Sequence, residues 1–223
     1  MRENSSVLLF VKMPGESNIK SRLAMTLGND ASVDIYKCFV ADIIGTLKKS
    51  AYPVIAFYYP PDAGDAASKW LGDDLPRFLQ RGVDIGDRMK NAFVSSFSWG
   101  LEKAVIIGSD IPDLTAEALD EAFLSLNDSD AVIGPASDGG YYLIGFRRET
   151  FLPGVFQKIT WGGDSVFSQT MELFGKSGAK VYVLPEHSDV DTIEDLRALF
   201  IRNKDTAFDK SLTMSFIAEH KLF

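Results

Sequence analysis

The sequence predicts an α/β fold, a three-layer α/β/α arrangement around a mixed, mainly parallel sheet. Three observations support this prediction. Short strand-like segments alternate with segments of helical spacing, most of the strand-like segments are apolar enough to be buried on both faces, and several of them end in Gly, Pro or Asp. No repeat or linker divides the chain, so residues 1–223 are predicted to form a single domain with a C-terminal helical tail at 202–223.

The strands are expected in chain order from Val7 to Leu184. Prolines after the second segment end it, and an Asp-Gly-Gly turn precedes the sixth. The predicted strands are Val7–Val11, Val54–Tyr59, Arg77–Gln80, Ala104–Ile107, Ala131–Ile133, Tyr141–Phe146 and Lys180–Leu184.

Helical spacing of apolar residues lies between these strands. Thr115 is a good N-cap for one of the helices, and Met13–Asn18, which contains Pro14 and Gly15, is predicted to be a loop. The predicted helices are Asp30–Lys48, Ile85–Phe97, Thr115–Leu126, Ser165–Phe174, Ile193–Ile201 and one more in the tail that ends at Phe223.

Composition excludes several classes of protein. The hydrophobic content of 46% predicts a substantial core, and the net charge of −8 argues against a nucleic-acid-binding surface. The single cysteine, Cys38, excludes an intramolecular disulfide and a multi-cysteine metal site. No apolar run is long enough to span a membrane and Met1–Ser6 is too short and polar for a signal peptide, so a cytoplasmic protein is expected. Composition neither requires nor excludes a homo-oligomer.

The stretch Gly108–Thr115 carries the most functional information. It follows the apolar run Ala104–Ile107, so Asp110 lies just past the carboxyl end of a central strand, where open α/β sheets bind ligands. An acidic side chain there suits a divalent cation that holds a pyrophosphate. The alternative is that Asp110 or Asp113 only caps a turn.

The loop after the first strand is basic in an otherwise acidic chain. Lys12, Lys20 and Arg22 surround Pro14 and Gly15, which indicates an anion site to which backbone N–H groups add donors. The loop has neither the Walker spacing nor a dinucleotide fingerprint. Ordinary solvated charges are the alternative.

Two further turns follow strands. Gln80 and Gly86 flank a strand-to-helix turn that lets the backbone approach a flat ligand, with Gln80 placed to read a base edge. Asp138 in the Asp-Gly-Gly turn is placed to contact a sugar hydroxyl or an acceptor. Plain connecting turns are the alternative in both cases.

The stretch Ser188–Thr192 follows the last strand. Its clustered carboxylates, Asp189 and Asp191, suit completion of a cation site begun by Asp110. The alternative is that Asp191 or Thr192 caps the next helix.

With these residues placed, the chain resembles the nucleotide-diphospho-sugar transferase superfamily, which has the glycosyltransferase A type of fold. It looks closest to a bacterial branch of glycosyltransferase-like proteins, distantly similar to the molybdenum-cofactor guanylyltransferases and phospholactate guanylyltransferases. The matching stretches are Lys12-Met13-Pro14 with Lys20-Ser21-Arg22-Leu23, Gln80–Met89, GSDIPDLT at 108–115, GPASDGGYYLIG at 134–145, ITWGGDSVF at 159–167 and DVDTIEDL at 189–196.

The resemblance implies a role for each matching position. Asp110 corresponds to a catalytic, metal-binding aspartate, and Asp191 to a second ligand of Mg²⁺ or Mn²⁺. Asp138 is the second catalytic candidate, on the sugar or acceptor side together with Gly139 and Gly140. The phosphate-contacting loop corresponds to Lys12, Pro14, Gly15, Lys20 and Arg22, and the base-contacting segment to Gln80 and Gly86.

Two positions depart from the branch's pattern. Ser17 stands where glycine is usual, which is expected to change how closely the loop approaches phosphate. Gly163 stands where threonine is usual, which weakens any role carried over to that turn.

The implied function is that of a metal-dependent transferase with a nucleotide-activated donor. Glycosyl transfer from a nucleotide-diphospho-sugar is favoured, and nucleotidyl transfer with release of pyrophosphate is the alternative. A nucleotide-binding protein without catalysis is a third. The expected partner is a nucleotide or a nucleotide sugar.

Overall fold

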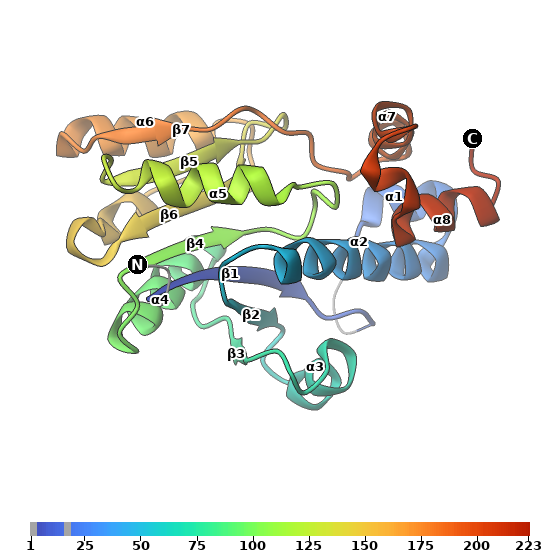
Figure 1. Ribbon diagram of the computed structural model, residues 1–223, viewed down its shortest axis with the longest axis horizontal. Coiled ribbons are helices and arrows are strands. Elements are labelled where there is room, and N and C mark those ends of the chain that lie inside the picture. The colour runs from blue at the N-terminus through green and yellow to red at the C-terminus, as the bar shows by residue number, and fades with distance from the viewer. Residues whose placement is uncertain (1–3, 16–18) are drawn as a thin grey trace.

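A mixed sheet forms the middle layer of the molecule (Figure 1). The computed structural model describes residues 4–15 and 19–223, and within them the sheet has seven strands in the order β3-β2-β1-β4-β6-β5-β7. Their bounds are β1 Ser5–Lys12, β2 Val54–Tyr59, β3 Arg77–Leu79, β4 Lys103–Ile107, β5 Ala131–Pro135, β6 Tyr141–Arg147 and β7 Val181–Val183.

The sheet is mainly parallel, which confirms the predicted fold class. Strands β1 to β4 pair in parallel with one another, and β5 pairs in parallel with β7. Strand β6 lies between β4 and β5 and is antiparallel to both. The carboxyl ends of the parallel strands therefore share one edge of the sheet, and β4, which precedes Asp110, is central in it.

Helices cover both faces of the sheet. Helices α2 and α5 lie on one face and α4 and α6 on the other, while α1, α7 and α8 gather beside α2 near the C-terminus (Figure 1). The helices are α1 Ser21–Leu27, α2 Asn29–Lys49, α3 Gly64–Leu71, α4 Ile85–Ser98, α5 Ala116–Ser125, α6 Val166–Ser177, α7 Ile193–Asn203 and α8 Leu212–Glu219.

Alternation along β1 divides its side chains between two cores. Val7, Leu9 and Val11 join the core formed with α2 and α5, while Leu8 and Phe10 join the core formed with α4 and α6. All five are buried, because a strand covered on both faces has no solvent side.

Two of the α-helices that the structure describes were not predicted. Helix α1 begins after Lys20 and α3 after Ala63, and neither N-cap residue makes a side-chain capping hydrogen bond. Short helices without a polar cap or long apolar periodicity give little signal in sequence. The start of helix α1 positions two predicted site residues, because Lys20 is its N-cap residue and Arg22 lies in its first turn.

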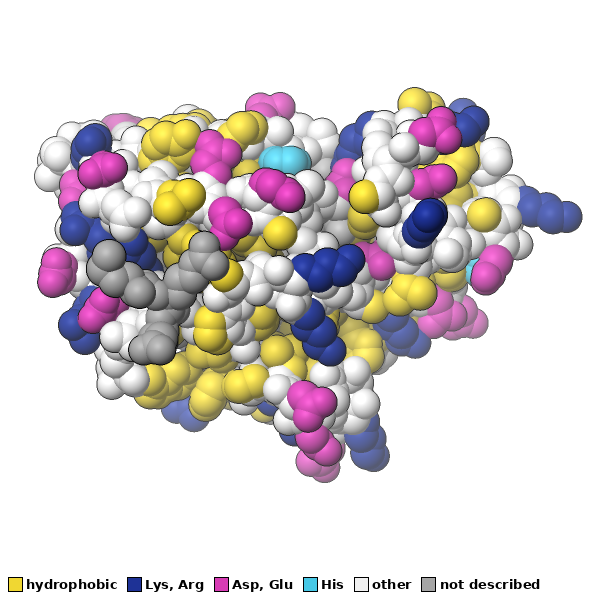
Figure 2. All heavy atoms as spheres, in the orientation of Figure 1, with side chains coloured by type: hydrophobic (Ala, Val, Ile, Leu, Met, Phe, Trp, Pro, Cys, Tyr) yellow, Lys and Arg dark blue, Asp and Glu magenta, His cyan; other side chains and the backbone are white. Residues whose placement is uncertain are grey.

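The surface shown in Figure 2 carries acidic and basic side chains interspersed with one another, and no single basic stripe crosses the face in view. Among the helices that the structure describes, none is both long enough and apolar enough to cross a membrane.

Candidate functional site

A cavity of about 600 Å³ opens at the carboxyl edge of the sheet. Its walls come from the ends of β1 and β4, the start of β6, the start of α4 and the loop that follows Thr160. Most of the predicted site residues line it, namely Lys12, Lys20, Arg22, Gln80, Asp110, Asp138, Gly140 and Asp191. Segments far apart in sequence therefore meet at the carboxyl edge of the sheet, the place expected because each segment follows a predicted strand.

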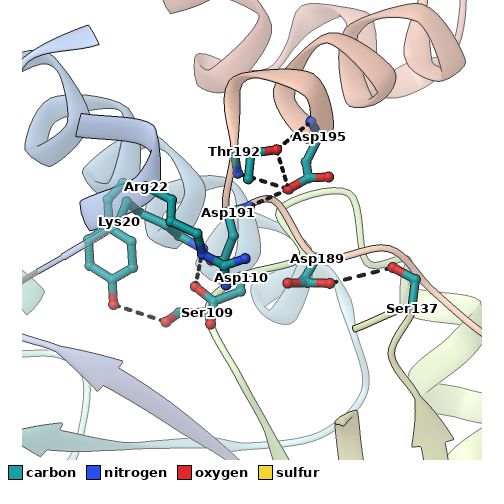
Figure 3. A network of polar contacts seen from close by, with 10 residues as sticks. Lys20, Arg22, Ser109, Asp110, Ser137, Asp189, Asp191, Thr192 and Asp195 are labelled. Carbon is teal, nitrogen blue, oxygen red and sulfur yellow. Dashed lines mark hydrogen bonds and ion pairs between the residues drawn. The ribbon is translucent and has the colours of Figure 1, made fainter. Parts of the chain in front are cut away.

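A carboxylate and cation cluster forms the charged wall of this cavity (Figure 3). The Lys20 ammonium forms ion pairs with both Asp110 and Asp191, and its Nζ lies 2.8 Å from Asp191 Oδ1. Arg22 Nη2 lies 2.7 Å from Asp191 Oδ2, so Asp191 pairs with two cations. The two predicted metal-binding aspartates thus face one another across a lysine.

The members of this cluster differ in exposure. The Lys20 side chain is 3% exposed, while that of Asp110 is 50% exposed and faces the cavity. Burial disfavours the Lys20 ammonium, but Asp110 and Asp191 outweigh it and raise the pKa of Lys20 above its ordinary value. Burial also disfavours the Asp191 carboxylate, yet Lys20 and Arg22 hold the pKa of Asp191 below its ordinary value. Both partners are therefore charged near neutral pH.

Tyr36 of α2 joins the two strand ends beneath the cluster. Its hydroxyl accepts a hydrogen bond from the Lys12 backbone N–H at 2.9 Å and shares another with the Ser109 hydroxyl at 2.9 Å. Burial, with a contribution from Asp110, raises the pKa of Tyr36 to about 12, so the hydroxyl stays neutral. The sequence does not single out Tyr36, because its helical spacing is that of an ordinary core position.

Asp113 is held away from the cavity. Its carboxylate accepts hydrogen bonds from Arg202 Nε at 2.8 Å, from Arg202 Nη2 at 3.1 Å and from Asn203 Nδ2 at 2.8 Å. Asp113 therefore binds the end of α7, which is a structural role different from the turn cap expected as the alternative for this stretch.

The cap of α7 is also separate from the charged cluster. Thr192 Oγ1 accepts from the Asp195 backbone N–H at 3.2 Å, and Asp195 reaches back to the Thr192 N–H at 2.8 Å (Figure 3). The capping alternative therefore applies to Thr192, and the Asp191 carboxylate remains available to the cavity.

The Asp-Gly-Gly turn forms another side of the cavity. Asp138 Oδ1 accepts from the Gly140 N–H at 2.8 Å. Gly139 has φ +87°, and a Cβ there would lie 2.0 Å from the Asp164 carbonyl oxygen, so the turn requires glycine and packs against the next loop.

Asp189 adds a carboxyl group on this side. Burial first, and then Asp138 and Asp191, raise the pKa of Asp189 to about 6. The Ser137 hydroxyl lies 3.5 Å from its carboxylate (Figure 3). A smaller cavity beside the main one is lined by Asp110, Asp138, Asp189 and Asp191.

Aromatic side chains form another part of the cavity lining. The Arg88 guanidinium lies 3.8 Å from the centroid of the Tyr59 ring, and both side chains line the cavity. Gln80 is buried, and its Nε2 donates to the Val11 carbonyl at 3.1 Å and the Phe57 carbonyl at 2.9 Å. The Gln80 amide, just after β3, is thus fixed in one orientation by carbonyl groups of β1 and β2.

Four predicted site residues do not line the cavity among the positions described: Pro14, Gly15, Gly86 and Gly139. Pro14 and Gly15 form a turn after β1. Gly86 leaves room for the ring of Trp161, because a Cβ at Gly86 would lie 2.3 Å from that ring. Trp161 itself lines the cavity. Ser17 lies outside the described residues, and Gly163 lines the cavity.

The donor set suits a hard divalent cation only in part. Asp110 and Asp191 supply carboxylate oxygens, the ligand type that Mg²⁺ and Mn²⁺ prefer. Within residues 4–15 and 19–223, no group of three or more His, Cys, Asp or Glu side chains is arranged to hold a metal ion. A cation bound to this pair therefore needs further oxygens from water or from a phosphate-bearing substrate.

Comparison with known proteins agrees with this architecture. Residues 43–163 match the model of a family described as "Uncharacterized protein conserved in bacteria (DUF2064)". No curated protein is significantly similar in sequence. A crystal structure from Desulfovibrio desulfuricans G20, of a protein provisionally named a nucleotide-diphospho-sugar transferase, is 39% identical and has a TM-score of 0.94, covering 98% of this chain and 95% of that one.

More distant solved structures share the fold alone. CMP:2-keto-3-deoxy-manno-octonic acid synthetase complexed with CTP is 12% identical, with a TM-score of 0.54 over 90% of this chain and 100% of that one. The manganese complex of Rv0371c from Mycobacterium tuberculosis H37Rv is 14% identical, with a TM-score of 0.51 over 87% of this chain and 96% of that one.

The family match and the close structural relative agree with the motifs that run from the first strand to the start of α7. The chain belongs to the bacterial DUF2064 family, within the nucleotide-diphospho-sugar transferase superfamily.

Proposed function

We propose that this protein is a metal-dependent transferase that moves a glycosyl group from a nucleotide-diphospho-sugar to an acceptor. The observation that carries the proposal is the convergence of Asp110, Asp191, Lys20 and Arg22 on one wall of a ligand-sized cavity. Carboxylates that suit a divalent ion, beside cations that suit phosphate, are what a nucleotide diphosphate requires.

The phosphates would bind at this charged wall. Asp110 and Asp191 would hold Mg²⁺ or Mn²⁺, which when bound neutralises phosphate charge and helps the diphosphate to leave. Lys12, Lys20 and Arg22 would contact the phosphate oxygens, and Arg22 can do so with two parallel hydrogen bonds. The turn of Pro14 and Gly15 would position the loop between Lys12 and Lys20 without lining the cavity itself.

The base would lie at the aromatic part of the cavity lining. There Tyr59 and Arg88 stack, Gln80 lines the wall, and Gly86 makes room for the indole of Trp161. A planar ring gains stacking energy against such side chains. This part and the charged wall belong to one cavity, so a nucleoside diphosphate can occupy both together.

The sugar or acceptor would lie beside Asp138, Gly139 and Gly140, on the turn that enters β6. In glycosyl transfer the bond between sugar C1 and the phosphate oxygen breaks, and C1 bonds to the acceptor oxygen. The hydroxyl proton passes to a base, and we assign that role to Asp138 because its carboxylate lines the cavity on the side of this turn. The nucleoside diphosphate leaves with the bonding electron pair.

Nucleotidyl transfer is the second candidate, favoured by the three cations Lys12, Lys20 and Arg22 along one cavity wall, which suit a triphosphate. In that reaction the α-phosphorus is attacked and pyrophosphate leaves.

The two reactions are separated by incubating the protein and Mn²⁺ with panels of nucleotide sugars and nucleoside triphosphates. Slow hydrolysis of a nucleotide sugar, lost in Asp138→Asn while nucleoside diphosphate affinity is kept, is the expected result. Pyrophosphate release from a triphosphate without hydrolysis of any nucleotide sugar would favour nucleotidyl transfer. Binding without either reaction would indicate a non-catalytic nucleotide-binding protein.

A further inference from the structure

The Lys20 ammonium lies between the two carboxylates that are assigned to the metal. It pairs with Asp110, which follows β4, and, at 2.8 Å, with Asp191, which precedes α7, so the two aspartates come from separate segments of the chain (Figure 3). Without a positive charge between them, two carboxylates so placed would repel each other. Lys20 therefore places one positive charge between the two carboxylates, where a divalent ion would bring two.

The position of Lys20 is closely constrained. Its side chain is almost fully buried, and lysine is rarely buried unless it is paired. Its backbone is left-handed, with φ 49° and ψ 47°, at the residue that precedes α1. A non-glycine residue in that region is unfavourable, and such strain is concentrated at functional sites. The backbone thus directs the ammonium to the pair at an energetic cost.

Arg22 provides a contrast within the same loop. Among the residues that the structure describes, its ion pair is with Asp191, at 2.7 Å, and its side chain is 60% exposed. Its guanidinium stays at the edge of the cluster and does not separate Asp110 from Asp191. Lys20 pairs with both aspartates, so it occupies the position that a metal ion held by both would need.

We propose that Lys20 and the divalent cation are alternative occupants of the Asp110–Asp191 pair, so that Lys20 holds the site closed to free metal. This inference rests on the metal site of the proposed function. The ammonium leaves the pair when a phosphate group offers it another anionic partner, and metal and nucleotide therefore enter together. Free Mn²⁺ binds weakly because it must displace a buried, paired cation.

The test uses Mn²⁺ alone as the probe, with no nucleotide, and measures free Mn²⁺ by electron paramagnetic resonance. Lys20→Met keeps the length and burial of the side chain but removes its charge. We expect it to bind Mn²⁺ more tightly than the wild type, by roughly the 5- to 150-fold typical of coupled sites. An equal affinity in the two proteins would overturn the proposal.

Two matched variants separate this effect from a general loss of positive charge. Lys20→Arg retains the cation and should bind Mn²⁺ as weakly as the wild type. Arg22→Met removes a cation from the same cluster without vacating the position between the aspartates, and should change Mn²⁺ affinity much less than Lys20→Met. An increase in Arg22→Met as large as that in Lys20→Met would contradict the proposal.

If Lys20→Met folds poorly, the test instead uses the melting temperature of Lys20→Gln, measured with and without Mn²⁺. Lys20→Gln should then lose melting temperature without metal and regain more of it on addition of Mn²⁺ than the wild type gains. No greater Mn²⁺-dependent gain in the variant would count against the proposal. Failure of the wild type to bind any nucleoside diphosphate with Mn²⁺ would instead refute the proposed function and leave the Lys20 result standing.

Discussion

Two aspartates three residues apart, Asp110 and Asp113, belong to different regions of the molecule. Asp110 is half exposed, faces the cavity and pairs with a lysine from another loop. Asp113 is 10% exposed and is clamped by Arg202 and Asn203 at the end of α7. Both follow the central strand β4, and both lie in the stretch that the sequence marks most clearly.

The two carboxylates differ in how far the fold itself satisfies them. The Asp113 acceptors are satisfied by donors that belong to the fold, so no ligand is needed. Asp110 pairs with a buried ammonium but leaves half of its side chain open to a cavity. Loss of Asp113 is therefore expected to cost stability, and loss of Asp110 to cost binding.

The largest expected effect is on metal-dependent binding. Asp110→Asn keeps the size of the side chain but removes a hard, charged ligand, so Mn²⁺-dependent binding of a nucleoside diphosphate should fall below detection in calorimetry. Asp113→Asn is the matched control and should bind like the wild type. Equal losses in the two variants would remove the distinction between the regions.

The next effect is on the free energy of unfolding, and here the larger loss is expected at Asp113. Asp113→Ala removes the acceptor of three hydrogen bonds, two of them from a guanidinium, and should lower the free energy of unfolding by about 2–3 kcal/mol. Asp110→Ala should cost less, because Lys20 retains Asp191 as a partner. Urea titration of both variants checks the order, and a larger loss in Asp110→Ala would reverse our assignment.

A smaller effect is expected at the phosphate loop. Arg22→Lys keeps the charge but removes two-point contact with phosphate, and should weaken nucleoside diphosphate binding by about 1–3 kcal/mol. Nucleoside binding should hardly change. If calorimetry found nucleoside and diphosphate equally weakened, Arg22 would act on the fold and not on phosphate.

The smallest effect concerns the C-terminal region, which we propose folds as one unit with the rest of the chain. Asp42 of α2 accepts hydrogen bonds from the Leu212 and Thr213 N–H groups, at 2.9 and 2.8 Å, at the start of α8. Asp42→Ala should cost about 1 kcal/mol, the scale of a lost helix cap. Thermal unfolding should remain a single transition, and a separate early transition would indicate an independent C-terminal unit.

The strand ends could be predicted from sequence because a buried strand is recognised from its own short apolar run. Apolar runs identify β1 and β4, and a parallel sheet brings their carboxyl ends to one edge, so Asp110 was expected near the loop of Lys12. The same reasoning brought Asp191 and Asp138 to that edge. These predictions needed no knowledge of side-chain contacts.

The partners of these residues could not be predicted in this way. Lys20 and Asp191 form an ion pair although they lie 171 positions apart in sequence. The position of Lys20 depends on the start of α1, where no side-chain capping hydrogen bond marks the helix in the sequence. The clamp on Asp113 and the hydroxyl of Tyr36 likewise depend on packing between distant segments. Local patterns therefore identified the edge where the site lies, while tertiary packing decides which charges meet there.

The most direct test of the central claim is an anomalous difference map from crystals grown with Mn²⁺ and a nucleoside diphosphate. We expect one strong manganese peak within coordinating distance of Asp110 and Asp191, next to the phosphates, with the Lys20 ammonium moved from between the carboxylates onto a phosphate oxygen. A manganese peak bound elsewhere, with Lys20 still between Asp110 and Asp191, would contradict the account.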